Sequence, residues 1–87
     1  MTIEPTYDER GLVPVIVQDV NTRAVLMLAY ANEASLEATI ATGRMTFWSR
    51  SRETLWEKGE TSGNTMSVVD MRLDCDSDAV LVRVEPA

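Results

Sequence analysis

Three aspartates alternate with a thiol and a hydroxyl between residues 74 and 78. Carboxylates about 4 Å apart repel one another by roughly 1–4 kcal/mol per pair, and a bound cation removes this repulsion. Hard ions such as Mg²⁺ or Ca²⁺ prefer oxygen ligands like those of Asp74, Asp76 and Asp78. A softer ion such as Zn²⁺ suits the thiolate of Cys75. The segment therefore predicts a metal site.

Shared coordination requires the chain to bend within this segment. In an extended strand Asp74 and Asp78 would lie roughly 13 Å apart. Two oxygens bound to one Mg²⁺ at about 2.1 Å can be no more than about 4.2 Å apart. Asp and Ser residues tolerate turns, so we expect a bend over Asp76–Asp78. Cys75 points away from its neighbours in an extended chain, which suggests a separate role.

Two other interpretations of the acidic segment remain open. A solvated acidic turn needs no ligand at all. An EF-hand loop is the second alternative, because the three aspartates and Glu85 match its ligand positions. Against it, Ala79 stands where that loop needs glycine, and the flanking residues alternate as strands do.

A basic cluster followed by a polar loop forms a candidate anion site. Backbone N–H groups and hydroxyls of such a loop can hold a phosphate, with basic side chains around it. The alternative is a set of solvated charges. Trp48 shares a strand face with Arg50, and is either a core residue or a partly exposed platform for a base. The candidate residues are Arg50, Arg52, Lys58, Thr61, Ser62, Gly63 and Asn64.

The elements that position these residues follow from the hydrophobic pattern and the turn residues. A hairpin is predicted from Val13 to Ala31, with its turn at Asn21-Thr22. A helix is predicted from an N-cap at Asn32 to a stop at Gly43, with Leu36 and Ile40 on its buried stripe. Further strands are expected at residues 44–49, near residue 55, at 65–73 and from residue 80. The fold class is α+β, with a mainly antiparallel sheet and one short helix.

Composition limits the classes of function. The 87 residues suffice for a single domain over 1–87, and 45% of them are hydrophobic. One cysteine excludes an internal disulfide framework and fits a reducing, cytoplasmic compartment. The apolar stretches are too short to cross a membrane, and the first residues lack a signal-peptide pattern. A net charge of −6 argues against a nucleic-acid partner.

The second strand of the predicted hairpin is apolar on both faces. Val25, Met27 and Ala29 lie on one face, and Leu26, Leu28 and Tyr30 lie on the other. A one-sided antiparallel sheet would instead alternate apolar and polar residues. We therefore expect a partner subunit to cover the second face.

Three stretches resemble phosphoribosyl-AMP cyclohydrolase, an enzyme of histidine biosynthesis. They are Phe47–Arg52, Leu55–Asn64 and Arg72–Asp76, and the opening hairpin is similar too, so that the likeness covers about residues 11–85. The resemblance implies a cytoplasmic, intertwined homodimer with its active sites at the subunit interface. It also implies hydrolysis of the adenine ring of phosphoribosyl-AMP between N1 and C6, which gives the formimino aminoimidazole carboxamide ribonucleotide.

The resemblance assigns roles to individual positions. Asp74, Asp76 and Asp78 match Mg²⁺ ligands, and Cys75 matches a zinc ligand shared across the dimer. Zinc-bound water, with its pKa lowered toward about 7, could attack an electron-poor ring carbon. The assignment of the basic residues to the substrate phosphates rests on charge alone.

The chain departs from the family pattern in three places. Ser77 stands where glycine is usual, and Met66 where glutamine is common. After its last strand the family continues into a Cys-His-Thr-Gly segment and a further cysteine, which complete the zinc site and supply a candidate general base. We therefore expect a C-terminally shortened form with weak zinc affinity, little or no activity and no identified general base. The alternatives are a non-catalytic Mg²⁺- or Ca²⁺-binding module and a dimerisation domain.

Overall fold

The computed structural model describes residues 3–60 and 62–87. Strands make up most of the regular structure, and a single helix is present in this part of the chain. The elements in chain order are β1 (Val13–Asp19), β2 (Val25–Ala31), α1 (Glu33–Thr42), β3 (Thr46–Ser49), β4 (Thr54–Glu57), β5 (Met66–Leu73) and β6 (Val80–Pro86). The predicted α+β class and the order of its elements are confirmed.

A four-stranded sheet carries the order β2-β1-β6-β5. The predicted hairpin is confirmed, since β1 and β2 are antiparallel, and so are β5 and β6. The central pair is different: β1 and β6 run parallel, with Val15 opposite Val80. The sheet is therefore mixed. Parallel neighbours need a long crossover, and here most of the chain separates the two strands.

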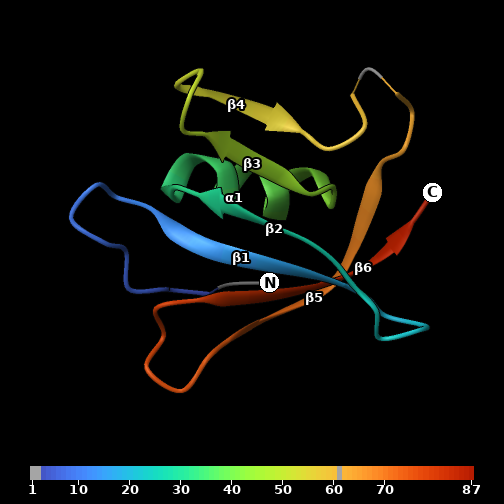
Figure 1. Cartoon of the computed structure of the whole chain (residues 1–87), viewed down its shortest axis with the longest axis horizontal. Coiled ribbons are helices and arrows are strands. Elements are labelled where there is room, and N and C mark those ends of the chain that lie inside the picture. Colours follow the sequence, from blue (N-terminus) through green and yellow to red (C-terminus); the bar gives the residue numbers. More distant parts are fainter. Residues whose placement is uncertain (1–2, 61) are drawn as a thin grey trace.

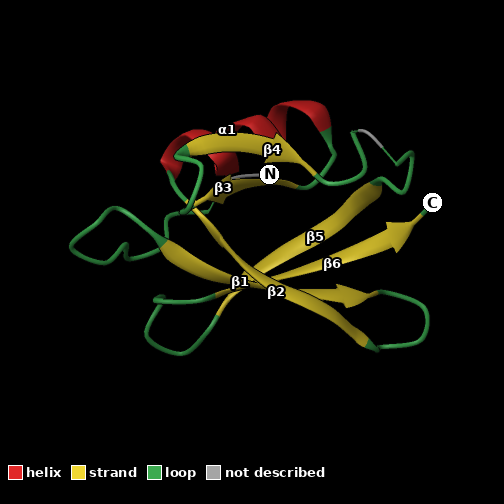
Figure 2. Ribbon diagram, turned by 45° about the horizontal axis from the view of Figure 1, so that its top comes forward, coloured by secondary structure: helices red, strands yellow, loops and turns green. Residues whose placement is uncertain are grey.

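The second layer consists of α1 and a separate hairpin of β3 and β4 (Figures 1 and 2). This separate sheet was not predicted. The segment before β3 connects the layers, because Met45 N–H donates to the Met66 carbonyl over 3.0 Å. Val68 N–H likewise donates to the Gly43 carbonyl over 2.8 Å. The second layer thus covers one face of the large sheet and is bonded to its β5 edge.

Helix α1 begins and ends at the predicted residues. The Asn32 side chain accepts a hydrogen bond from Ser35 N–H over 2.9 Å, and the Ser35 hydroxyl accepts one from Asn32 N–H over 2.9 Å. This reciprocal pair is a capping box. Gly43 ends the helix with φ of 75°, a left-handed conformation that glycine adopts without strain.

The prediction that Ile40 shares the buried stripe of α1 is wrong. Leu36 is 3% exposed, whereas Ile40 is 38% exposed. The buried side of the helix runs through Thr39 instead, whose hydroxyl accepts a hydrogen bond from Thr46 N–H over 3.0 Å and donates to the Thr46 carbonyl over 3.1 Å. These bonds fix the Thr39 side of the helix against β3, which turns Ile40 outward.

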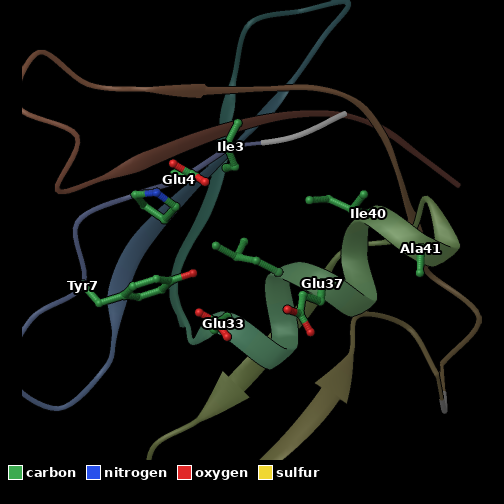
Figure 3. Close-up of a pocket in the computed structure, with 9 residues that line it drawn as sticks. Ile3, Glu4, Tyr7, Glu33, Glu37, Ile40 and Ala41 are labelled. Atoms are coloured by element: carbon green, nitrogen blue, oxygen red, sulfur yellow. The ribbon is translucent and has the colours of Figure 1, made fainter.

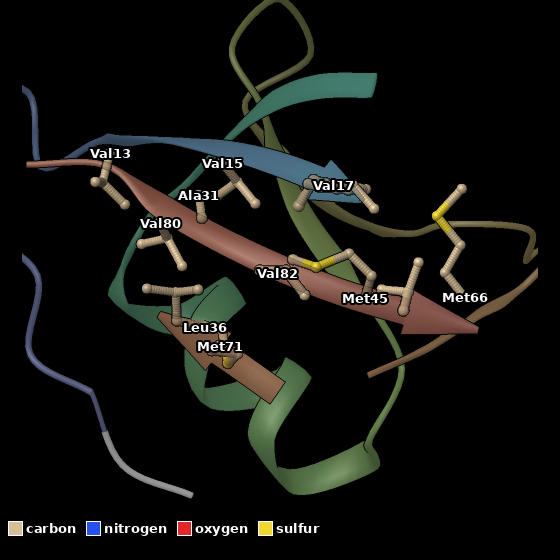
Figure 4. Close-up of a cluster of buried hydrophobic side chains, with 12 residues drawn as sticks. Val13, Val15, Val17, Ala31, Leu36, Met45, Met66, Met71, Val80 and Val82 are labelled. Atoms are coloured by element: carbon tan, nitrogen blue, oxygen red, sulfur yellow. The ribbon is translucent and has the colours of Figure 1, made fainter. Parts of the chain in front are cut away.

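The core lies between the two layers and is built from alternating strand residues (Figure 4). Val15 and Val17 of β1 and Val82 of β6 have no exposed surface. Phe47 of β3 fills the space opposite them and is also fully buried, with its ring centroid 5.0 Å from that of Trp56. Alternation of apolar residues in β1 and β6 therefore gives the sheet one well-packed face.

The other face of the large sheet has no cover within the described residues. Val25 is 66% exposed, Leu28 is 58% exposed and Val69, at an irregularity in β5, is 46% exposed. The sequence pattern puts Val25 on the face of Met27, and that prediction is wrong, because a register shift in the β1–β2 pair sets Val25 opposite Gln18, on the outer face with Leu28. The partner subunit expected to cover that face stays a prediction.

The strand conformation of β6 excludes the EF-hand alternative. The residues around Glu85 form a strand, where an EF-hand requires the start of its exit helix.

Within the described residues, the only helix is too short to cross a membrane.

Candidate functional site

The acidic segment forms a tight bend between β5 and β6, as the sequence predicts. Asp74 N–H donates to the Ala79 carbonyl over 3.1 Å, and Ser77 N–H donates to the Asp74 carbonyl over 3.2 Å. One carboxylate oxygen of Asp74 accepts the N–H groups of Asp78, over 2.9 Å, and of Ala79, over 3.2 Å. The Asp74 side chain therefore fastens the bend from within.

Ser77 sits at the tightest point of the bend with φ of 64°. Residues with a Cβ rarely adopt this left-handed conformation, whereas glycine adopts it freely. The family that the sequence resembles usually has glycine at this position. The bend is therefore kept despite the substitution, with some local strain.

The bend brings the three predicted metal ligands together. Asp74, Asp76 and Asp78 each offer a carboxylate oxygen, and these oxygens lie within 4.8 Å of one another. Two oxygens bound to one Ca²⁺ at about 2.4 Å would be up to about 4.8 Å apart, and slightly closer on Mg²⁺. All three side chains are exposed, so water can complete the coordination shell. The donor set fits one hard divalent cation.

The electrostatics of the bend show the cost of placing these carboxylates together. Hydrogen bonding to the carboxylates of Asp76 and Asp74 raises the pKa of Asp78 to about 6, and desolvation and charge repulsion act in the same direction. Desolvation also raises the pKa of Asp74, but hydrogen bonds from Asp78 and from Ala79 N–H outweigh it and lower the pKa overall. Without a cation, the cluster therefore holds a proton near neutral pH more readily than isolated aspartates do.

Cys75 is exposed, as expected for a residue flanked by two aspartates. The cluster of metal-binding groups among the described residues contains the three aspartates and not the Cys75 sulfur. Catalytic zinc normally has three protein ligands. Since these 87 residues contain one cysteine and no histidine, Cys75 alone does not make a zinc site within one chain.

The structure divides the predicted anion site into two groups. Arg50 and Arg52 lie in the turn between β3 and β4, whereas Lys58 follows β4, at the opposite end of this hairpin (Figure 1). Lys58 N–H donates to the Met45 carbonyl over 2.9 Å. Thr61 lies outside the described residues. The remaining loop residues, Ser62, Gly63 and Asn64, lie on the Lys58 side.

The arginine group lies at the same end of the molecule as the aspartates. β1 and β6 begin at this end, β3 ends there, and the acidic bend joins β5 to β6 there (Figures 1 and 2). Thr6 N–H donates to the Ser77 carbonyl over 2.6 Å, which places the N-terminal segment against the bend. Within one chain, the metal ligands and the Arg50 turn therefore lie at the same end of the molecule, and the Lys58 loop follows the opposite end of the β3–β4 hairpin.

Sequence reasoning missed Arg10. This residue lines a hollow of about 440 Å³ together with Arg50 and Ser51. The pattern Asp8-Glu9-Arg10-Gly11 indicates a surface turn, but it carries no signal that Arg10 meets a turn forty residues later.

Arg72 lies near a carboxylate of its own strand. Its guanidinium lies 3.9 Å from Asp70. Arg83 is the closer partner of Asp70 and donates to both of its oxygens, one of them from Nε over 2.9 Å. The Arg83 hydrogen bond lowers the pKa of Asp70. Asp70 is therefore part of a structural ion pair on the outer face of the sheet and not a metal ligand.

A cavity of about 580 Å³ lies elsewhere, between α1 and the N-terminal segment (Figure 3). Leu36 and Ile40 form part of its apolar wall, and Glu33 and Glu37 add negative charge. Burial and then these two glutamates raise the pKa of Tyr7 at its edge. A cavity with this charge repels phosphates, and none of the predicted site residues lines it.

Comparisons with known proteins agree on one family. A family model described as phosphoribosyl-AMP cyclohydrolase matches residues 27–87. The chain is 59% identical over 83 residues to a phosphoribosyl-AMP cyclohydrolase of Archaeoglobus fulgidus, covering 95% of this chain and 77% of that protein. It is 58% identical over 83 residues to one of Sphingopyxis alaskensis, covering 95% of this chain and 66% of the relative.

A third relative is larger. The chain is 62% identical over 80 residues to the histidine biosynthesis bifunctional protein HisIE of Thermus thermophilus. The match covers 92% of this chain and 37% of that protein. The chain thus spans about three quarters of the Archaeoglobus relative and less than two thirds of several others.

Proposed function

The chain belongs to the phosphoribosyl-AMP cyclohydrolase family, and on that premise we propose that its site serves the hydrolytic opening of the adenine ring of phosphoribosyl-AMP in histidine biosynthesis. One observation supports the proposal above the others. Three carboxylate oxygens lie within 4.8 Å of one another at the bend that carries the family's acidic motif.

The proposed reaction adds one water across the N1–C6 bond of the adenine ring. The water oxygen bonds to C6, the C6–N1 bond breaks, and N1 takes up a proton, which leaves the formimino aminoimidazole carboxamide ribonucleotide. The protein must bind the anionic substrate, orient the ring and activate the water. In an acidic chain, the first task requires a local basic region or a metal ion.

We propose that Asp74, Asp76 and Asp78 hold Mg²⁺. Asp74 is oriented by the two backbone N–H groups that it accepts, and the bend directs the other two carboxylates toward it. A divalent cation bound there would polarise an oxygen ligand and offset the charge of substrate phosphates. The three carboxylates would hold the ion in a fixed position relative to the sheet.

We propose that Cys75 is a zinc ligand in an assembly and not in the isolated chain. Its thiol is exposed beside the acidic bend and is available to a site shared between subunits. Further protein ligands must complete such a site, because one thiolate does not hold catalytic zinc. Zinc affinity that is unchanged by Cys75→Ser would contradict this assignment.

The assembly that we propose is a homodimer. Its supporting feature is the uncovered apolar face of the large sheet, with Val25, Leu28 and Val69 exposed. Leu28→Arg should shift the molecular mass measured by analytical ultracentrifugation from dimer to monomer. A monomeric wild-type chain at high concentration would contradict the proposal.

We propose that both basic groups bind the substrate, but in different subunits. Arg50 and Arg52 lie at the end with the aspartates, whereas Lys58, Ser62, Gly63 and Asn64 follow the opposite end of the hairpin. Thr61 is assigned to the same substrate-binding group from its position in the sequence alone. The substrate has a phosphate on each of its two ribose units. In a dimer, the loop of one subunit would complete the site that the arginines of the other begin.

Turnover tests the proposed function directly. The purified chain is mixed with phosphoribosyl-AMP, Mg²⁺ and Zn²⁺, and ring opening is followed by ultraviolet absorbance and by mass spectrometry of the product. The Archaeoglobus relative is the positive control, and Asp76→Asn is the matched negative variant. Product formed by the wild-type chain and not by Asp76→Asn supports the proposal.

The rate of turnover and an absence of product are also informative. The sequence-based expectation of little activity requires a rate far below that of the Archaeoglobus relative, and an equal rate contradicts it. Metal binding without product, while the relative turns over, would favour the alternative of a non-catalytic metal-binding module.

A further inference from the structure

A basic pocket lies between the N-terminal segment and the turn after β3. It consists of two adjoining hollows, of about 440 Å³ and about 280 Å³, that share two arginines. Neither composition nor motif pointed to this pairing. The residues that line the two hollows are Arg10, Leu12, Trp48, Arg50, Ser51 and Glu53.

The backbone that carries Arg10 is fixed by a compact turn. One carboxylate oxygen of Asp8 accepts the N–H groups of Arg10, over 2.8 Å, and of Leu12, over 3.0 Å. The Leu12 and Arg10 hydrogen bonds lower the pKa of Asp8, so this anchor is ionised at neutral pH. Asp8 N–H also donates to the Leu12 carbonyl over 2.8 Å. The turn is therefore organised before any ligand arrives.

The Arg50 side chain is also positioned. Its guanidinium carbon lies 3.9 Å from the centroid of the Tyr30 ring, a cation–π contact that orients the planar group. Among the described residues, Arg10 and Arg50 form no ion pair, whereas Arg44, Arg72 and Arg83 each have a carboxylate partner. The Arg50 guanidinium is therefore oriented, and both arginines keep N–H donors available for a ligand.

The chemistry of the walls defines the ligand class. Guanidinium groups bind phosphate oxygens through paired, charge-assisted hydrogen bonds. Half-buried Trp48 and buried Leu12 add a flat apolar wall suited to a heterocycle. Glu53 also lines the smaller hollow, and its negative charge disfavours polyphosphates. We infer that Arg10 and Arg50 together form the subsite for one phosphate monoester of a purine nucleotide.

This inference rests on the proposed function and adds Arg10 to the residues that bind its substrate. The pocket lies at the end of the molecule that carries the acidic bend, since the segment leading to Arg10 is bonded to the bend through Thr6 and Ser77. A nucleotide phosphate in this pocket would therefore share an end of the sheet with the proposed metal ion.

Binding of AMP and of adenosine tests the subsite. Both ligands are titrated calorimetrically in EDTA, so that no divalent ion at the acidic bend can hold the phosphate. We expect AMP to bind at least about tenfold more tightly than adenosine, and Arg10→Gln to weaken AMP binding about tenfold while leaving adenosine unchanged. Arg10→Lys should restore part of the loss, because it restores charge without the planar fork.

The matched control is Arg23→Gln, which removes the same charge from the turn between β1 and β2, at the other end of β1. Arg23→Gln should leave the affinities for AMP and for adenosine unchanged. Equal affinities for AMP and adenosine, or equal losses in Arg10→Gln and Arg23→Gln, would overturn the subsite.

A turnover assay distinguishes failure of the phosphate subsite from failure of the proposed function. If the wild-type chain opens phosphoribosyl-AMP and Arg10→Gln leaves KM unchanged, the subsite is wrong and the proposed function stands. If the metal-loaded chain neither binds nor opens phosphoribosyl-AMP but AMP binding depends on Arg10, the phosphate subsite stands and the proposed function is wrong.

Discussion

β5 and β6 pass from the valine core directly into the acidic bend, and the two regions differ in almost every physical respect. In the core, Val82 and Val84 are fully buried, and their alternation matches the pleat of the sheet. In the bend, carboxylates repel one another and Ser77 adopts a conformation that suits glycine. A few residues that oppose folding are thus held by neighbours that favour it. Such concentration of unfavourable features is expected where a protein binds a ligand.

The largest effect should come from the core. Phe47→Ala removes a fully buried ring and should lower the free energy of unfolding by about 3–5 kcal/mol, close to the whole stability of a domain of this size. Urea denaturation followed by tryptophan fluorescence measures it. Phe47→Leu, which keeps most of the volume, should cost much less. Equal losses for both variants would show that the core is less tightly packed than described.

The Asp70 ion pair is the next test, because it lies on the same strands but on the outer face. Asp70→Asn leaves Arg83 without its charged partner and should lower the free energy of unfolding at pH 7. Arg83 lowers the pKa of Asp70 below its ordinary value of 3.8, so the stabilisation is complete above pH 3.8. It is lost as the pH falls through the lowered pKa. The difference in free energy of unfolding between the wild type and Asp70→Asn should therefore be larger at pH 7 than at pH 2.5.

Ser77→Gly should remove strain from the bend and raise the free energy of unfolding by about 1 kcal/mol. Thermal denaturation measures the gain. Gly11→Ser, at a φ of 77° with open space around its Cβ position, is a matched control and should lose a similar amount. A stability loss in Ser77→Gly would mean that the serine makes a compensating contact.

The smallest effect on stability should come from Asp78→Asn, and its sign depends on the metal. The pKa of Asp78 is raised to about 6, so its ionised form destabilises the fold at pH values above 6, and this penalty vanishes below 3.8. In EDTA, Asp78→Asn should therefore melt at a slightly higher temperature than the wild type at pH 8, with no difference at pH 3.5.

Addition of Mg²⁺ at pH 8 should reverse that order, because the wild type gains stability from binding while the variant does not. The wild-type melting temperature should rise with Mg²⁺ concentration. A variant that responds to Mg²⁺ as strongly as the wild type would exclude Asp78 as a ligand.

Local features of this fold could be predicted from the sequence because their signals are local. Asn32 and Gly43 bound the helix through caps that involve only nearby residues. The bend at residues 74–78 follows from turn-tolerant residues and from the need to bring three carboxylates together. These predictions rest on short-range hydrogen bonds and on backbone preference.

Long-range features could not be predicted in the same way. The hydrophobic pattern identifies β1 and β6 as strands but does not say that they pair, or that they run parallel. Arg50 and Lys58 are close in sequence, yet β4 carries Lys58 to the far end of the hairpin. Arg10 meets Arg50 only through the packing of two turns, which leaves no pattern in either segment.

The parallel pairing of β1 with β6 has a consequence for how the chain acquires its structure. The centre of the sheet joins residues near the beginning of the sequence to residues near position 80, so it cannot form until the ribosome has released β6. Contacts between such distant residues slow folding, because the connecting chain must first be brought together. Until then, the apolar residues of β1 and β2 lack their central neighbour and are open to aggregation. Expression at low temperature, which slows synthesis and association, should therefore increase the yield of folded protein.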